Sequence, residues 1–431
     1  MKVRISENFK PFRVRHRDKY YYILNNLFER SNFVKSYEED DFLPLNSEIL
    51  KRILGGRYKE YVKELLLEGY LETDNRYICG EKSMGYRLSE RYLASKMKRD
   101  ILVDKKIIEK VWNFREEKIQ EAIQNINHEF VYNNLQKLEI HHSNALNDIN
   151  SQLEKGLITL NSYNFQKLSI EKIAEKNIHF SLGKKSGRIF HNVSSLKKTL
   201  RQYLHFSSNH LVEIDIKNSQ PILFASLLDK YCNCDNNNQT ITSYQVYKQT
   251  MSLQGTTPYV HQKDIDLSYL TADVLFYRKL VEEGTLYDYL RDLLKLKDMS
   301  KSELKKHILK TIFYAKNSYT TNDFLIFRGV FPTVAGAIKY FKRHDYRNLP
   351  ILLQRIEAEL MFNDVISELR KKGIYAITIH DSILTLYEFA DYVSELMRDC
   401  VFRKTGLRAR VTKGSITPIL NNISIPDSYY N

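Results

Sequence analysis

Apolar positions near the start of the chain recur at two spacings, which together predict a small domain over residues 1–95. Three stretches are predicted to be helices, residues 18–31, 48–54 and 58–68, and the third carries Tyr61, Val62, Leu65 and Leu66 at the spacing of a helix with one buried face. Ser47 precedes the second stretch and is a candidate N-cap. Two shorter stretches, 69–72 and 85–88, predict strands on either side of a loop.

Three helices followed by a β-hairpin is the element order of a winged helix, a fold that commonly places its third helix in a DNA groove. Basic side chains on the third helix and the hairpin would contact phosphates: Arg57, Lys59, Lys63, Lys82 and Arg87. A winged helix that binds only protein, or only packs, is the alternative.

The rest of the chain divides into two further predicted domains. Residues 96–181 contain no proline and a single glycine, Gly156, and predict a long helical region with a break at that glycine. This region would serve as a connector or as a thumb that grips a strand. From residue 182 to residue 431, short β-like runs alternate with helical ones, which predicts a mixed α and β domain.

Two apolar runs in the last domain each carry one aspartate. The run 210–216 predicts a buried strand with Asp215 near its end. The run 375–386 predicts a β-hairpin whose tip is the polar triplet 380–382. A lone aspartate in such a place is most often a cap or turn residue, but the two runs together favour a shared site.

Asp215 and Asp381 are suited to metal binding. An ionised aspartate among apolar residues is costly unless something compensates its charge. Mg²⁺ does so well, because it prefers oxygen ligands and commonly takes one or two carboxylates together with substrate phosphates. Two carboxylates could hold two Mg²⁺ ions, for which Mn²⁺ can substitute, and such a pair supports an in-line displacement at phosphorus.

The charge balance points to a polyanionic partner. Lys and Arg number 66 against 52 Asp and Glu, which gives a net charge of +14 and a pI near 9.2. Phosphate contacts release condensed counterions, so this surplus favours nucleic acid, although simple solubility is the plainer reading. The 30 Tyr and 21 Phe could stack on unpaired bases, but most must form core. No apolar run is long enough to span a membrane, and reduced thiols fit a cytoplasmic protein.

Three segments resemble a known polymerase superfamily. Residues 213–220 and 379–382 resemble the first and third palm motifs of the family A DNA polymerases and the related single-subunit, phage-type RNA polymerases. Residues 306–315 resemble the fingers helix of the same superfamily. The resemblance covers about residues 186–411 and implies an α+β right-hand polymerase with palm, fingers and thumb-like helices.

The resemblance implies a role for each matching residue. Lys310 would meet the triphosphate of the incoming nucleotide with help from Lys306, and Tyr314 would stack near its base and sugar. His380 would pack under the primer terminus. Gln220 stands where the DNA enzymes carry a ribose-blocking glutamate.

Further matches are weaker. Arg188 and Arg201 lie in a segment similar to one that contacts primer and template. Gln354 and Arg355 lie in a segment similar to the helix at the primer-template minor groove. The backbone carbonyl of Ile216 would complete the metal ligands.

We therefore expect a template-directed nucleic-acid polymerase that binds template, primer and nucleoside triphosphates, acts as a monomer and serves a plasmid, phage or other mobile element. The His-Asp-Ser triplet and Ala315 depart from the DNA-polymerase pattern, so the sugar preference stays open. An RNA polymerase or primase-like enzyme is the nearest alternative. A non-catalytic replication initiator and a nuclease are the others.

Overall fold

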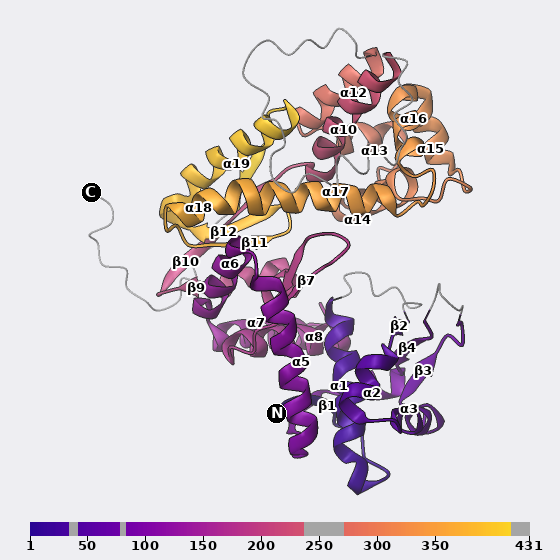
Figure 1. Cartoon of the computed structure of the whole chain (residues 1–431), viewed down its shortest axis with the longest axis vertical. Coiled ribbons are helices and arrows are strands. Elements are labelled where there is room, and N and C mark those ends of the chain that lie inside the picture. Colours follow the sequence, from indigo (N-terminus) through magenta and orange to yellow (C-terminus); the bar gives the residue numbers. More distant parts are fainter. Residues whose placement is uncertain (34–41, 78–82, 237–270, 415–431) are drawn as a thin grey trace. The chain divides into compact units, whose positions relative to one another are not determined.

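The computed structural model describes residues 1–33, 42–77, 83–236 and 271–414, which form two compact units (Figure 1). Unit 1 comprises Met1–Gln124, Leu135–Ser181 and Phe190–Ser208, and unit 2 comprises Asn125–Asn134, Leu182–Ile189 and Asn209–Asn431. Both units combine helices with small antiparallel sheets, which is the predicted α+β class. The predicted residue Lys82 lies outside the described residues.

Unit 1 is built from short strands and mostly helical segments. Its elements are β1 (Lys2–Ser6), η1 (Val14–His16), α1 (Arg17–Phe33), β2 (Leu43–Pro44), α2 (Ser47–Leu54), α3 (Tyr58–Leu67), β3 (Leu71–Thr73), β4 (Gly85–Leu88), α4 (Glu90–Leu93), β5 (Met97–Ile101), α5 (Lys105–Ile123), β6 (Glu139–Ile140), α7 (His142–Glu154), α8 (Leu160–Ala174), α9 (Asn192–Ser195), η2 (Lys198–Tyr203) and β9 (Leu204–Phe206). The chain passes between the units along α6 (Ile126–Lys137), β7 (Phe180–Leu182) and β8 (Ile189–His191).

The three helices predicted near the N-terminus are α1, α2 and α3, and the predicted strands are β3 and β4. β4 lies between β2 and β3 in a three-stranded antiparallel sheet. The prediction of Ser47 as N-cap is wrong. Asn46 caps α2 instead, because its side chain accepts from the backbone N–H groups of Glu48 (2.9 Å) and Ile49 (3.1 Å).

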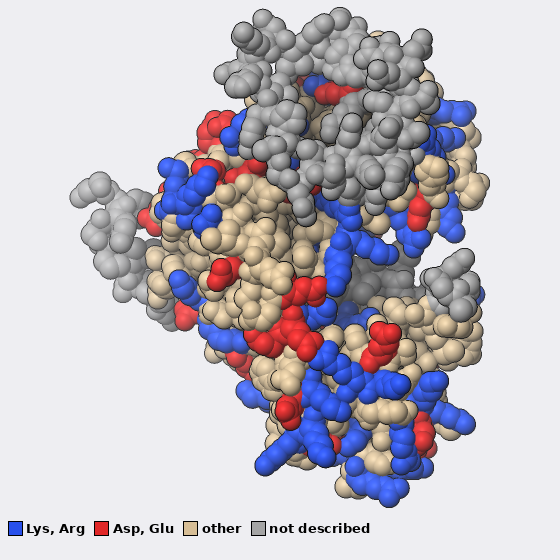
Figure 2. All heavy atoms as spheres, viewed as in Figure 1, with Lys and Arg blue, Asp and Glu red and all other residues tan. Residues whose placement is uncertain are grey.

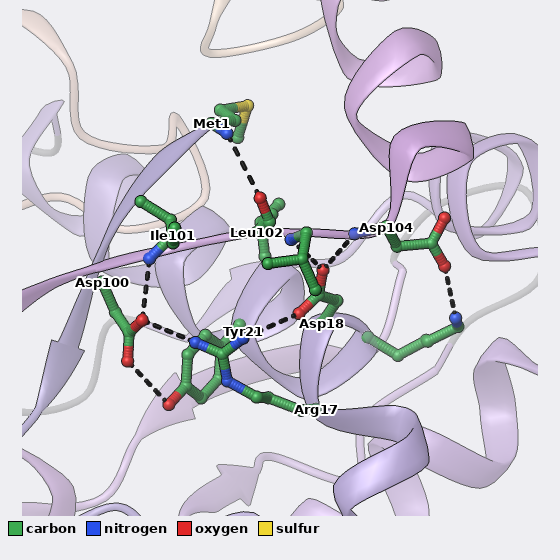
Figure 3. A network of polar contacts seen from close by, with 10 residues as sticks. Met1, Arg17, Asp18, Tyr21, Asp100, Ile101, Leu102 and Asp104 are labelled. Carbon is green, nitrogen blue, oxygen red and sulfur yellow. Dashed lines mark hydrogen bonds and ion pairs between the residues drawn. The ribbon is translucent and has the colours of Figure 1, made fainter.

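A polar network fastens the start of α1 to the chain between β5 and α5 (Figure 3). Asp18 accepts from the backbone N–H groups of Val103 (2.5 Å) and Asp104 (2.7 Å). Arg17 and the hydroxyl of Tyr21 both donate to Asp100, at 2.5 and 3.0 Å. The two bonds to Asp18 satisfy backbone donors just before α5, which no helical carbonyl can reach.

Buried charges join α8 to the helices of the predicted winged helix. The Lys172 ammonium on α8 lies 2.8 Å from the Glu29 carboxylate on α1, and Arg115 on α5 lies 3.6 Å from it. Burial alone would raise the pKa of Glu29, but Lys172 and Arg115 lower it to about 2. The carboxylate is therefore ionised and held by two cations from two other helices.

Unit 2 carries the two aspartate runs. Its elements are β10 (Asn209–Ile216), α10 (Ser219–Asn236), α12 (Ala272–Glu282), α13 (Leu286–Leu293), α14 (Lys301–Ile308), η3 (Leu309–Phe313), α15 (Asn322–Val330), α16 (Pro332–Phe341), α17 (Asn348–Glu359), η4 (Leu360–Ile366), α18 (Ser367–Lys371), β11 (Ala376–Ile379), β12 (Ser382–Leu386), η5 (Tyr387–Phe389), α19 (Ala390–Thr405) and β13 (Val411–Lys413). The elements η3 and η4 are π-helical, and they extend α14 and α17.

An antiparallel sheet in the order β11–β12–β10 lies at the centre of unit 2, and β13 pairs with the other edge of β10. Val212, Ile214 and Ile216 alternate along β10 and are all buried, so the opposite face of this strand carries Glu213 and Asp215. Helix α19 packs against β10 and β12, and α10 packs against α17. The sheet therefore has one apolar face and presents its acidic face to the site.

We predict that Lys172→Met destabilises the protein by about 3 kcal/mol, because it leaves the Glu29 carboxylate, only 17% exposed, with the amide of Asn25 and the more distant Arg115 as its remaining partners. Urea titration followed by circular dichroism would measure the loss. The double variant Lys172→Met/Glu29→Leu removes both charges and should recover most of it. A single variant as stable as the wild type would contradict the role of this pair.

Candidate active site

The register of the central sheet brings the two predicted aspartates together. Asp215 on β10 is paired with Ser382, the first residue of β12, in the antiparallel ladder. Asp381 immediately precedes Ser382, and its carbonyl oxygen accepts from the backbone N–H of Ile216 at 3.4 Å. Both aspartates are only half-buried. Two segments far apart in the sequence thus place carboxylates on neighbouring backbone positions.

The tip of the β11–β12 hairpin is a tight two-residue turn. Ile379 pairs with Ser382, so His380 and Asp381 alone make the connection. His380 has a φ of 58°, a left-handed conformation that such turns require and that histidine adopts more readily than most residues. Ser382 lies in the strand rather than at the tip, and its hydroxyl donates to Glu213 at 3.0 Å. This bond ties the hairpin to the acidic face of β10.

A buried glutamate that the sequence reading missed lies beside this pair. Glu357 on α17 is 1% exposed and accepts from the guanidinium of Arg188, with Nε at 2.8 Å and Nη2 at 2.6 Å. Its second oxygen accepts from Gln220 Nε2 at 2.6 Å and from the Ser219 hydroxyl at 3.4 Å. Burial and the negative charge of Asp381 raise the pKa of Glu357 to about 7, against the opposing effect of Arg188.

Tyr314 joins the same group of side chains. Its hydroxyl donates to Gln220 Oε1 at 3.4 Å, and burial raises its pKa to about 12, so the phenol stays protonated. Tyr287 on α13 was also missed. Its hydroxyl is buried and has no hydrogen-bond partner among the described residues, and its pKa is raised by burial and by the charges of Tyr314 and Asp381. An unpartnered buried donor beside a carboxylate is a ready contact for a bound ligand.

The predicted fingers helix is α14 continued by η3. Ser300 and Glu303 start α14 with a capping box, in which each side chain accepts from the backbone N–H of the other. At the far end, Tyr314 N–H donates to the carbonyl of Leu309, five residues back, at 2.9 Å. This wider π-helical turn places Tyr314 beside Gln220, and Lys306 and Lys310 remain exposed.

The remaining predicted residues are placed as follows. Arg355 Nε donates to the carbonyl of Lys185 at 2.6 Å, which fastens the loop before Arg188 to α17. Gln354 is half-buried on the same helix. Arg201 lies in η2 of unit 1, so it is not among the side chains that unit 2 brings together.

The oxygen donors of this site fit Mg²⁺ better than a softer metal. They are two carboxylates, with backbone carbonyls of β10 beside them, and Mg²⁺ takes few protein carboxylates when substrate phosphates supply further oxygens. Within the described residues no group of three or more His, Cys, Asp or Glu side chains could hold a metal ion. The arrangement therefore lacks the closed ligand set of a structural metal site.

Comparisons with known proteins find matches among solved structures only. No family model matches the chain, and no curated protein matches it. Among solved structures, 93 chains match, including the POL domain of Pol1 from M. smegmatis in complex with DNA primer-template and dNTP. That match has 13% identity and a TM-score of 0.30, and it covers 62% of this chain and 55% of that one. So low a TM-score carries no conclusion about activity.

No described helix is long and apolar enough to cross a membrane.

A buried lysine supports the end of the fingers helix. Lys342 follows α16, is 3% exposed and donates to the carbonyls of Ala315 (2.9 Å) and Ile312 (3.4 Å). Burial, together with the nearby charge of Lys339, lowers its pKa to about 8. The ammonium thus satisfies carbonyls that a helix end leaves unpaired.

This pKa predicts how stability depends on pH. Lys342 releases its proton near pH 8 in the folded protein but near 10.5 when unfolded, so between these values the unfolded chain binds more protons and stability rises with pH. Lys342→Met should lose that rise, whereas Lys301→Met, at an exposed position of α14, should keep it. Urea titrations from pH 8 to 10.5 would compare the three proteins. Equal slopes for wild type and Lys342→Met would show that the ammonium is not desolvated.

Proposed function

We propose that the protein is a template-directed nucleic-acid polymerase that joins a nucleoside triphosphate to a 3′-hydroxyl and releases pyrophosphate. The observation that carries this proposal is the pairing of Asp215 with Ser382, which sets Asp381 beside Asp215 at the acidic face of the central sheet. Both aspartates are half-buried. This is the arrangement expected for a site that works on phosphates through bound cations.

Asp215 and Asp381 would hold two Mg²⁺ ions, with the backbone carbonyl of Ile216 as a further ligand and Mn²⁺ able to substitute. When bound, Mg²⁺ activates the attacking hydroxyl and neutralises charge on the triphosphate. The protein's own part is to keep the carboxylates ionised and in place. The Ser382–Glu213 hydrogen bond and the turn at His380 support that part, since both fix the hairpin against β10.

The nucleotide would lie against the side chains that surround Glu357. Lys310 and Lys306 are exposed on consecutive turns of the fingers helix and would meet the triphosphate. Tyr314 and Gln220 would face the base and sugar, and Tyr287 offers a buried donor close to Asp381. Arg188, held by Glu357, would contact primer, template or triphosphate. Positioning and charge neutralisation together account for most of the expected rate.

Nucleic acid is the partner that unit 1 would bind. Lys59 and Lys63 lie one turn apart on the exposed side of α3, where a winged helix would offer them to phosphates. Arg57 and Arg87 are paired with Glu60 and Glu72 instead, so their charges are partly neutralised. Figure 2 shows further basic side chains over the part of unit 1 turned to the viewer. The helices over residues 96–181 would act as connector or thumb.

We favour a DNA polymerase of a plasmid, phage or other mobile element, acting in the cytoplasm as a monomer. An RNA polymerase or primase-like enzyme of the same superfamily is the closest alternative, because Gln220, Ala315 and Ser382 depart from the DNA-polymerase pattern. A non-catalytic replication initiator would need neither the aspartate pair nor the fingers lysines. A nuclease would need the pair but not the lysines.

We predict that Asp381→Asn and Asp215→Asn each lower templated primer extension by about a hundredfold or more, because each removes a carboxylate that would hold the cations where negative charge develops. Extension of a labelled primer on a DNA template with Mg²⁺, comparing dNTPs, rNTPs and a no-primer control, would measure it. Asp292→Asn, at a side chain 71% exposed on α13, is the matched control and should keep full activity.

The same assay separates the alternatives. Extension with only one nucleotide class identifies the sugar. Metal-dependent loss of the labelled strand without nucleotides would replace the polymerase by a nuclease. Tight DNA binding without extension under any condition would replace it by an initiator.

A further inference from the structure

Glu357 occupies a place where a carboxylate has no packing reason to be. It lies on the core face of α17, where Leu353, Ile356 and Leu360 mark the buried stripe at helical spacing. Burying an ionised carboxylate is costly unless hydrogen bonds and a counter-charge compensate it. The reason for a carboxylate at position 357 must therefore lie in the side chains that it binds.

Glu357 holds side chains from two other segments. Its Oε1 takes both nitrogens of Arg188, from the loop before β8, and its Oε2 takes Gln220 and Ser219 from the start of α10. Bonds of this kind to a charged group are about twice as strong as neutral ones. Arg188 is itself only 18% exposed along its side chain, so both members of the ion pair are constrained.

The carboxylate also fixes which way the Gln220 amide points. Above its pKa of about 7, the Glu357 carboxylate is ionised and can only accept hydrogen bonds, so the NH₂ group of Gln220 then faces it and the amide oxygen faces away. That oxygen is where the Tyr314 hydroxyl donates, at 3.4 Å. The three side chains therefore form a chain with one direction, in which Tyr314 donates to Gln220 and Gln220 donates to Glu357.

We infer that Glu357 is a positioning residue of this site, which sets nucleotide binding by holding Arg188 and the Gln220–Tyr314 pair in a single arrangement. The inference rests on the proposed polymerase function for the identity of the ligand. It differs from the metal-binding role of Asp215 and Asp381, because Glu357 acts through other side chains. A glutamine at position 357 keeps the shape but can donate as well as accept, so the Gln220 amide is free to turn over and Arg188 loses its counter-charge.

Glu357→Gln is the variant that tests the inference, and Glu359→Gln is its matched control. Glu359 lies on the same helix but pairs with Lys404, at 3.4 Å, on α19. In primer extension, Glu357→Gln should raise the KM for the nucleotide about tenfold and leave kcat within about threefold, the pattern of lost binding interactions rather than lost chemistry. Glu359→Gln should change neither constant. Thermal unfolding of both variants checks that they are folded.

A coupling measurement excludes a merely structural role. Tyr314→Phe removes the hydroxyl that donates to Gln220, so it should raise KM in the wild type but have little further effect in Glu357→Gln, where the chain is already broken. Additive effects of the two substitutions on KM would overturn the inference. A lower unfolding temperature in Glu357→Gln with an unchanged KM would also overturn it.

Calorimetric titration with Mg²⁺ and a nucleoside triphosphate separates this inference from the proposed function. If the wild type binds nucleotide but extends no primer, the proposed polymerase activity fails, whereas about tenfold weaker binding by Glu357→Gln would still support the role of Glu357. Equal nucleotide binding by wild type and Glu357→Gln, or none by the wild type, would contradict it.

Discussion

The antiparallel pairing of β10 with β12 is the constraint on which the site depends. Side chains alternate along a strand, so a slip of one residue would turn Asp215 toward the apolar face that α19 covers. The observed register is fixed from both sides: Val212, Ile214 and Ile216 are buried on one face, and Ser382 bonds Glu213 on the other. Because the hairpin turn has only two residues, the same register also fixes the backbone of Asp381.

In each unit, a charged side chain with little exposure lies where several segments meet. Glu357 gathers Arg188, Ser219 and Gln220 in unit 2, and Glu29 gathers Lys172 and Arg115 in unit 1. An apolar residue at either position could fill space but could not select one arrangement of polar neighbours. Specificity of this kind costs stability, since each ion must be desolvated before its partners compensate it. The two clusters therefore make local geometry sensitive to single substitutions.

Much of the local structure could be predicted because it follows from short-range patterns. Helix-like stretches near the N-terminus located α1, α2 and α3, and the two apolar runs located β10 and the β11–β12 hairpin. The cap of α2 was assigned one residue too late, because asparagine and serine are about equally good caps and Asn46 is followed directly by Ser47, the first residue of the helix. The division of the chain into compact units was harder to predict from the sequence. Unit 1 draws on residues from all three predicted domains, because contacts such as Lys172–Glu29 join segments distant in the sequence.

The site could be predicted only in part, because some of its residues contact segments that are distant in the sequence. The motifs around Asp215, Asp381 and the predicted fingers helix are continuous in the sequence, whereas Glu357 binds side chains of other segments and Tyr287 lies near charged groups of other segments. One signal was available: Glu357 and Lys342 are charges at positions that continue the apolar stripes of α17 and α16. A charge on a buried stripe indicates a partner, but the sequence does not say which one.

The central claim is that Asp215 and Asp381 share a divalent-cation site. Replacing Mg²⁺ by Fe²⁺ in the presence of ascorbate and peroxide generates hydroxyl radicals at the bound metal, which cleave the nearby backbone, and mass spectrometry locates the cuts. We predict cuts at both β10 and the β11–β12 turn, suppressed together by excess Mg²⁺ and lost together in Asp215→Asn. Cuts at only one of these segments, or cuts that persist in that variant, would contradict a shared site.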